Sequence, residues 1–344
     1  MCTNVTIPRK SKDDALISAR TLDWFTEDNF KSSIANFVPR GQFFPESSLP
    51  GEMHWRNKYS FIGIGIKTKL IPIAYSDGLN ETGLSAACLS LFSSKYPKRK
   101  YGKPILYNPN LVSYILGNFK NIQEVKQALS EITIVNISEL LPEENISSLL
   151  HYIVSDIYGN HLIIEFVDGE MKLYTSRLGV LTNDPTYDWQ LTNNNFYSQL
   201  SLENTTTLVC NELISTNGQL GIPGDISPQA RFVRAAFLRR TAFNPQTTQE
   251  AIGVAKQIIQ TLAVPIGTVI VSAPQIPAGS FDWTQWSVIR DHTNLSYYFC
   301  SGFNSKLYGI HLKKLNLNSS EQRHIDVIQP DWYEDVTGKL ECRP

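Results

Sequence analysis

The chain opens with MCTNVTI at residues 1–7 and continues, after the polar stretch PRKSKDD at residues 8–14, with ALISARTL at residues 15–22. The two outer stretches are rich in Val, Ile, Leu and Thr, which favours strands, whereas Pro, Lys and Asp between them favour a turn. We therefore predict an antiparallel hairpin at the start of the chain. Such a hairpin brings Arg20 and the nearby Asp23 alongside Cys2.

Further strands and helices follow in groups. The sequence predicts strands at Tyr59–Ile66, Leu84–Leu91, Leu150–Ile157, Leu162–Val167, Met171–Thr175, Trp283–Arg290, Leu295–Cys300 and Leu307–Leu312. Helical spacing of apolar residues predicts helices at Leu111–Leu116, Ile122–Leu129, Gln229–Leu238 and Thr248–Leu262, with Asn121 and either Thr247 or Thr248 as N-caps. The stretch DGLN at residues 77–80 is interpreted as a turn. This grouping favours an α+β fold with layered sheets over a doubly wound parallel sheet.

Composition excludes several classes of protein. The 344 residues are 42% hydrophobic and 18% charged, with a net charge of −1, so we expect a sizeable core rather than disorder. Lys and Arg do not gather into a long stripe, which argues against a dedicated nucleic-acid binder. The longest uncharged stretch, Gln257–Phe281, is interrupted by Pro265, Pro274 and Pro277 and is not expected to span a membrane.

Common catalytic and cofactor motifs do not occur in the sequence. It has no P-loop, no H-E-x-x-H and no G-x-S-x-G, and the Gly63–Gly65 pair lacks the third glycine of a dinucleotide fingerprint. The 6 histidines are scattered, and no C-x-x-C pair occurs among the cysteines, which are Cys2, Cys88, Cys210, Cys300 and Cys342. We therefore expect neither a metal ion nor an organic cofactor.

Cys2 differs from the other cysteines in its position. Once Met1 is removed, the Cys2 thiol has a neighbouring base in its own α-amine, whose pKa is ordinarily about 7.7–8.0. A thiolate also needs a cation, and the ammonium that forms needs a carboxylate; the predicted hairpin offers Arg20 and Asp23. The alternative is an initiator methionine followed by an ordinary cysteine. The spacing of these residues leaves both interpretations open.

Short motifs follow one another along most of the chain. They are MCT at residues 1–3, ARTLDW at 19–24, DGLNETGL at 77–84, LTNDPTYD at 181–188, PGD at 223–225 and RFVRA at 231–235. Together they resemble the choloylglycine hydrolases, a family that comprises bile salt hydrolases and penicillin V acylases. The resemblance implies an N-terminal-nucleophile hydrolase with a four-layer αββα sandwich, in which two stacked sheets lie between helical layers. It also implies hydrolysis of a linear carbon–nitrogen amide bond.

The resemblance assigns roles to particular residues of this chain. It implies that Cys2 is the nucleophile, that its amine is the general base, and that Arg20 supports the thiolate. It implies that Asp23 accepts a hydrogen bond from the amine, and that the side-chain amide of Asn183 contributes to an oxyanion hole. Arg231 matches an arginine near the nucleophile. The alternative for Arg231 is a salt bridge at the edge of the core.

The position that lines the site after the strand at Leu84–Leu91 departs from the family pattern. It is asparagine in typical bile salt hydrolases and aromatic in many penicillin V acylases, whereas it is Ser90 here, which still offers a backbone N–H to the oxyanion hole. Trp24 is expected to contact the substrate, and Trp24 and SKYP at residues 94–97 resemble the Gram-negative branch. We therefore expect aromatic acyl amides such as penicillin V, or N-acyl homoserine lactones, before conjugated bile salts.

The remaining expectations concern the mature protein. We expect a single domain over residues 2–344, with Met1 removed, and the resemblance implies a homo-oligomer, a tetramer as in relatives. The acyl group would enter an apolar pocket near Trp24 and the uncharged Leu262–Pro277 segment, although a plain core role fits that segment equally. The compartment stays open: cytoplasmic as written, periplasmic or secreted if a leader was removed. A non-catalytic, ligand-binding relative of the same fold is the alternative to an enzyme.

Overall fold

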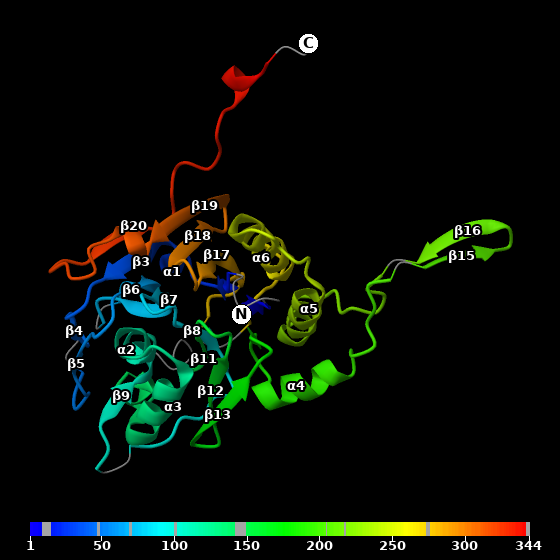
Figure 1. Cartoon of the computed structure of the whole chain (residues 1–344). Helices are drawn as coiled ribbons and strands as arrows, with labels where there is room; N and C mark the ends of the chain where they lie inside the picture. Colours follow the sequence, from blue (N-terminus) through cyan, green and yellow to red (C-terminus); the bar gives the residue numbers. More distant parts are fainter. Residues whose placement is uncertain are drawn as a thin grey trace.

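The computed structural model describes residues 1–8, 15–46, 49–68, 71–99, 102–141, 149–203, 205–216, 218–272 and 276–341. Two large antiparallel sheets are stacked, and helices cover the outer side of each sheet (Figure 1). Helices α5 (Pro228–Thr241) and α6 (Thr248–Leu262) pack on the first sheet, and α2 (Leu111–Asn118) packs on the second. The fold is therefore the predicted four-layer αββα sandwich.

The first sheet has six strands in the order β14-β1-β2-β17-β18-β19. Their bounds are β1 (Cys2–Ile7), β2 (Ile17–Trp24), β14 (Val180–Leu181), β17 (Trp283–Asp291), β18 (Ser296–Ser301) and β19 (Asn304–His311). The predicted N-terminal hairpin is present, since β1 and β2 pair antiparallel, and it lies inside the sheet between β14 and β17. Most of the predicted turn, residues 9–14, lies outside the described residues.

The second sheet has eight strands in the order β13-β12-β11-β8-β7-β6-β3-β20. Their bounds are β3 (Ser33–Val38), β6 (Phe61–Ile66), β7 (Ala74–Asn80), β8 (Ser85–Ser90), β11 (Leu150–Ser155), β12 (His161–Val167), β13 (Glu170–Ser176) and β20 (Arg323–Asp326). The strands predicted at Leu150–Ile157, Leu162–Val167 and Met171–Thr175 are present as β11, β12 and β13, which pair in sequence order as an antiparallel meander. Strands β3 and β20, which form one edge of this sheet, were not predicted from the sequence.

Shorter elements complete the fold. The remaining helices are α1 (Glu27–Ser32), α3 (Ile122–Glu131) and α4 (Tyr187–Asn195). Small two-stranded sheets form from β4 (Phe43–Phe44) with β5 (Trp55–Arg56), β9 (Ile105–Tyr107) with β10 (Thr133–Val135), and β15 (Thr205–Val209) with β16 (Glu212–Thr216). The β15–β16 hairpin and the C-terminal end of the chain project away from the sandwich (Figure 1), whereas Val327, directly after β20, is buried in the core.

Local sequence signals fix the starts of two helices. Asn121 accepts a hydrogen bond from the backbone N–H of Glu124 across 2.9 Å, as predicted for the N-cap of α3. At α6 the N-cap is Thr247, which forms a capping box with Glu250. Both caps satisfy backbone N–H groups that a helix leaves without partners at its first turn.

The interpretation of residues 77–80 as a turn is wrong, because they form the second half of β7. Asp77 is fully buried in the strand, where Arg20 and Arg290 pair with its carboxylate. Gly78 is required for close packing, since a Cβ there would lie 2.7 Å from the carbonyl oxygen of Ile62. Tertiary contacts therefore override the turn propensity of the sequence.

Apolar side chains fill the space between the two sheets. Ile62, Ile64 and Leu79 of the second sheet pack against Trp286, Val288 and Phe299 of the first. No helix in the part of the chain that the structure describes has both the length and the apolar character needed to cross a lipid bilayer.

Candidate active site

Cys2 begins β1 and is buried, with 3% of its surface exposed. In the β1–β2 ladder Cys2 lies opposite Leu22, and Asn4 lies opposite Arg20. Residues two apart in a strand share a face, so Arg20 is the diagonal neighbour of Cys2. Its Nη2 lies 3.8 Å from the Cys2 Sγ. The hairpin thus brings the thiol and the guanidinium together as predicted.

Arg20 is fixed in the buried space between the sheets. Nη1 donates to the Ser76 carbonyl oxygen across 2.6 Å, and Nη2 donates to that of Cys88. Burial alone would lower the pKa of Arg20, but the charges of Cys2, Asp77 and Cys88 outweigh burial and raise it. The guanidinium therefore remains a cation beside the sulfur, and such a cation favours a thiolate.

Asp77 is the carboxylate that pairs with Arg20, a role that was not predicted from the sequence. It accepts hydrogen bonds from Arg20 Nη1 at 3.2 Å, from Arg290 Nε at 2.9 Å and from the Tyr297 hydroxyl at 2.8 Å. Arg20, Arg290 and Tyr297 belong to the first sheet, whereas Asp77 belongs to the second. This network joins the two sheets next to the thiol and supplies three donors to the Asp77 carboxylate, whereas Arg20 Nε has no hydrogen-bond partner among the described residues.

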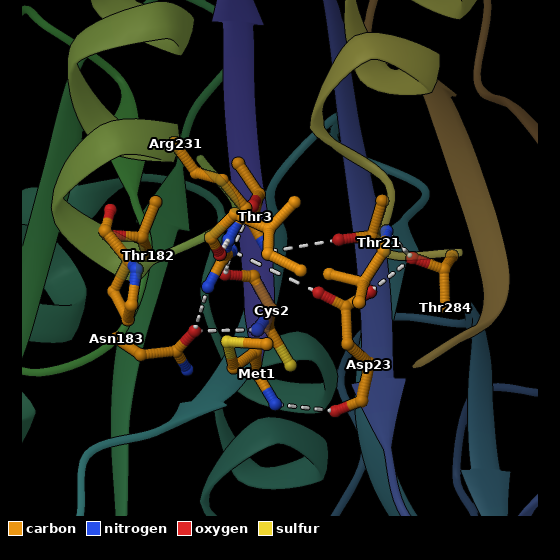
Figure 2. Close-up of polar contacts among 12 residues, drawn as sticks. Met1, Cys2, Thr3, Thr21, Asp23, Thr182, Asn183, Arg231 and Thr284 are labelled. Atoms are coloured by element: carbon orange, nitrogen blue, oxygen red, sulfur yellow. Dashed lines mark hydrogen bonds and ion pairs between the residues drawn. The ribbon is translucent and has the colours of Figure 1, made fainter. Parts of the chain in front are cut away.

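Arg231 of α5 is fully buried against the first residues of β1. Its Nη1 donates to the Cys2 carbonyl oxygen across 2.5 Å and also to Thr3 Oγ1, and its Nη2 donates to Asn183 Oδ1 across 2.9 Å (Figure 2). Burial lowers the pKa of Arg231, although the charge of Asp23 opposes this shift. Arg231 therefore lies in the buried interior next to Cys2, where it also faces Asp23 Oδ2 at 3.9 Å, and its part in the reaction stays a prediction.

Asn183 follows β14 and links three parts of the site. Its Oδ1 accepts from the Cys2 backbone N–H across 2.7 Å, and its Nδ2 donates to the Ser90 carbonyl oxygen across 2.7 Å. Because Arg231 can only donate, it holds the Oδ1 end of the amide towards itself and the Nδ2 end towards Ser90. An amide NH2 carries two hydrogens, so Nδ2 can donate a second hydrogen bond.

The backbone of β8 faces this amide. Strand β7 pairs with β8 only from Ser85 to Ala87, so the end of β8 has no β7 partner. Leu91 donates its N–H to the Leu149 carbonyl oxygen, and successive residues of a strand point their N–H groups to opposite sides. The N–H of Ser90 consequently points away from β11, on the same side as the Ser90 carbonyl that binds Asn183.

Asp23, near the end of β2, is fully buried. Its Oδ1 accepts from Thr284 Oγ1 across 2.5 Å. Its Oδ2 has no hydrogen-bond partner among the described residues and lies 3.9 Å from Arg231 Nη1. Burial raises the pKa of Asp23, and the charge of Arg231 acts in the opposite direction. Asp23 therefore has one acceptor oxygen available for a further donor.

Met1 precedes Cys2 in the chain, and its ammonium is held by two groups. It donates to the main-chain oxygen of Asp23 across 2.9 Å and to Asp282 Oδ2 across 2.7 Å. The nitrogen of Cys2 is accordingly a peptide nitrogen in this structure (Figure 2). The predicted hydrogen bond from a free Cys2 amine to the Asp23 carboxylate requires the loss of Met1 and stays a prediction.

Trp24 ends β2 at the edge of this cluster, and its ring packs on Phe25 with centroids 4.5 Å apart. Part of the uncharged segment after α6 also reaches the site, since Val264 donates its backbone N–H to Thr284 Oγ1. Val264 is buried, whereas Ile266 and Ile270 are exposed, and residues 273–275 lie outside the described residues. A contact of Trp24 or of this segment with substrate stays a prediction.

The other cysteines lie elsewhere or are chemically different. Cys88 is buried in β8, where burial raises the pKa of its thiol to about 12. Cys210 is exposed, Cys300 is half-buried, and Cys342 lies outside the described residues. Within the described ranges, no group of three or more His, Cys, Asp or Glu side chains is arranged to hold a metal ion.

An αββα sandwich whose first strand starts with a buried cysteine defines an N-terminal-nucleophile hydrolase. The family model of the linear amide C–N hydrolases, choloylglycine hydrolase family, matches residues 2–325, and the chain belongs to that family. The protein is therefore an amidohydrolase that acts on linear amides of small molecules.

Characterised relatives include two kinds of amidase. The chain is 30% identical to a bile salt hydrolase/transferase of Clostridium perfringens, over 93% of this chain and 95% of the relative. It is 28% identical to a penicillin V acylase of Pectobacterium atrosepticum, over 92% of this chain and 82% of the relative. Both similarities extend over nearly the whole chain.

Solved structures show the same two kinds of relative. A mutant conjugated bile acid hydrolase from Clostridium perfringens superposes with a TM-score of 0.79 at 26% identity, over 94% of this chain and 96% of that one. The penicillin V acylase from Agrobacterium tumefaciens superposes with a TM-score of 0.76 at 26% identity, over 94% of this chain and 91% of that one.

Proposed function

We propose that Cys2 is the nucleophile of this amidohydrolase and that its α-amine, freed by loss of Met1, is the general base. The observation that carries the proposal is the 3.8 Å approach of the Arg20 guanidinium to the buried Cys2 sulfur. A buried thiolate needs such a cation, and a terminal amine supplies the base without a histidine. We also propose that residues 2–344 form a single domain.

The reaction proceeds through a thioester. The Cys2 thiolate attacks the acyl carbonyl carbon, and the second hydrogen of Asn183 Nδ2 and the N–H of Ser90 stabilise the oxyanion that develops. The protonated α-amine, oriented by Asp23 Oδ2, gives its proton to the leaving amine as the carbon–nitrogen bond breaks. Water then hydrolyses the thioester and regenerates the thiol. The positions of Asn183, Ser90 and Asp23 around Cys2 support these roles.

Arg231 acts through other residues in this scheme. It holds the Asn183 amide by its oxygen and the main chain of Cys2 by its carbonyl, so that both reacting parts keep their relative position. We therefore class Arg231 as a positioning residue. No metal ion or organic cofactor has a role in these steps.

The candidate substrates differ in the acyl group that is transferred to Cys2. We propose aromatic acyl amides such as penicillin V, or N-acyl homoserine lactones, ahead of conjugated bile salts, because Ser90 stands where typical bile salt hydrolases carry asparagine. Trp24 and Val264 at the edge of the cluster are the apolar residues proposed to contact the acyl group. A homotetramer is proposed by analogy with the family.

The test compares Cys2→Ser with Cys300→Ser on a panel of phenoxyacetyl amides, acyl homoserine lactones and glycine or taurine bile conjugates. Loss of Met1 is first confirmed by mass. We expect Cys2→Ser to lose at least about 100-fold in kcat, because a hydroxyl is a far weaker nucleophile at neutral pH. Near-normal rates in Cys2→Ser contradict thiolate attack, and fastest turnover of a bile conjugate reverses the substrate order.

The alternative of a non-catalytic, ligand-binding relative makes a different prediction. Such a protein binds amides from the panel but hydrolyses none of them, and it leaves Cys2 unreactive towards thiol reagents. The occupied positions of Arg20, Asp23, Asn183 and Arg231 favour the enzyme.

A further inference from the structure

Asp282 is a buried carboxylate that the proposed reaction does not use. It lies directly before β17, is 7% exposed, and holds the Met1 ammonium through Oδ2 at 2.7 Å. Its Oδ1 has no hydrogen-bond partner among the described residues. The main-chain oxygen of Asp23 completes the contact at 2.9 Å from the same ammonium. Together, Asp282 and the Asp23 oxygen form an ammonium subsite.

The Asp282 carboxylate of this subsite needs a cation or hydrogen-bond donors as partners. A carboxylate removed from water is costly unless a cation or several donors satisfy it. In the structure the Met1 ammonium satisfies Asp282, and this ammonium leaves with Met1. The ion pair lies close to the protein surface, because the Met1 side chain is 16% exposed and the Asp282 side chain is 9% exposed. Another cation can therefore reach Asp282 from solvent in the mature protein.

The position of this ammonium relative to the thiol defines the ligand chemistry. The Met1 ammonium is borne by the carbon next to the Met1 carbonyl, and that carbonyl carbon is bonded to the nitrogen of Cys2. Attack of the Cys2 sulfur on that carbon would close a five-membered ring. The subsite is therefore placed to bind an α-ammonium, that is, an ammonium on the carbon next to the carbonyl that Cys2 attacks.

We propose that the mature site binds α-aminoacyl amides, with their α-ammonium on Asp282 Oδ2 and the Asp23 carbonyl oxygen. This proposal rests on the proposed amide hydrolysis and specifies the acyl group that it accepts. The reaction is unchanged: the acyl carbon–nitrogen bond breaks, the acyl group passes through the Cys2 thioester, and water supplies its OH to the acid and its proton to the amine. Asp282 is a specificity determinant in this scheme and touches the substrate ammonium.

The experiment uses two amides that differ by a single amine: a phenylglycyl amide and the corresponding phenylacetyl amide, with the same leaving amine. Both are assayed at slightly acidic pH, where the α-amine is protonated, on protein that has lost Met1. We expect kcat/KM for the phenylglycyl amide to exceed that of the phenylacetyl amide by about tenfold or more, as a charge-assisted hydrogen bond allows.

Asp282→Asn separates the possible roles of this carboxylate. We expect at least a tenfold loss of kcat/KM for the phenylglycyl amide, mostly in KM, and a change within about twofold for the phenylacetyl amide. The control is Asp168→Asn, a change at an exposed turn. Equal losses with both amides would mean that Asp282 serves the Cys2 amine, and this result overturns the proposal. Equal rates on both amides in the unaltered protein overturn it as well.

A binding measurement keeps this proposal separate from the proposed function. Phenylglycinamide and phenylacetamide are each added to the protein while a thiol-directed reagent labels Cys2. We expect phenylglycinamide alone to slow the labelling, and only while Asp282 is present. If no amide is hydrolysed but this protection is found, the hydrolase mechanism fails and the subsite stands. If both amides protect equally, the subsite is wrong whatever the enzyme hydrolyses.

Discussion

Arg231 Nη2 donates to Asn183 Oδ1 across 2.9 Å, and this contact decides which end of the Asn183 amide faces the thiol side of the site. Because a guanidinium has no acceptor atom, the amide oxygen must point to Arg231 and the NH2 group must point away. A helix of the outer layer thereby sets the direction of a donor in the first sheet's active site. The catalytic proposal depends on this orientation.

Asn183→Ala removes the proposed side-chain donor of the oxyanion hole. We expect kcat to fall by about 100-fold to 1,000-fold, which corresponds to roughly 3–4 kcal/mol of transition-state stabilisation, with a much smaller change in KM. Steady-state kinetics on the best substrate of the panel measure both constants. Asn195→Ala, on the exposed side of α4, is the matched control. A kcat within a few-fold of the unaltered enzyme contradicts the role of Asn183.

Asp77→Asn removes the carboxylate that Arg20 and Arg290 share. Two buried guanidinium groups then lack their counter-ion, so we expect the free energy of unfolding to fall by roughly 3–5 kcal/mol. Chemical denaturation measures this change. Asp331→Asn breaks the exposed ion pair with Lys306 and should have little effect by comparison. An Asp77→Asn protein as stable as this control would show that the network does not stabilise the sandwich.

His161 should make the fold sensitive to acid. Burial, together with the charges of Arg239 and His292, lowers the pKa of His161 from 6.5 to about 3. A lowered pKa in the folded state means that the unfolded chain binds the proton first. The stability contributed by neutral His161 is therefore complete above about pH 6.5 and is lost progressively as the pH falls towards 3.

The variant His161→Asn isolates this effect, since asparagine can keep a hydrogen bond to Ser155 Oγ, which lies 2.7 Å from His161 Nδ1. The difference in denaturation midpoint between the unaltered protein and the variant should shrink as the pH is lowered below 6.5. A difference that stays constant over this range contradicts a buried neutral histidine.

The sequence predicted those parts of the fold that local signals determine. The hairpin of β1 and β2 and the caps at Asn121 and Thr247 follow from turn residues, β-branched residues and side-chain acceptors within a few positions. The prediction failed at residues 77–80, where a turn-like composition forms a strand because Asp77 is neutralised by residues that are remote in sequence.

The site was predictable to a similar extent. Arg20 lies beside Cys2 because one hairpin carries both residues, so spacing alone indicated the pair. Asn183 follows β14 and Arg231 lies on α5, so they are far from Cys2 in the sequence. Only the resemblance to a family identified them as candidate site residues. Asp282 and Thr284 were missed, because nothing in their own neighbourhood links them to residues at the start of the chain.

The most direct test of the account is the intact mass of an active preparation, followed by brief thiol-directed labelling and peptide mapping. We predict a mass that lacks Met1, a single label on Cys2, and loss of amidase activity in proportion to that label. Full activity in protein that retains Met1, or inactivation by a label on Cys88, Cys210, Cys300 or Cys342 with Cys2 unmodified, would contradict an N-terminal cysteine nucleophile.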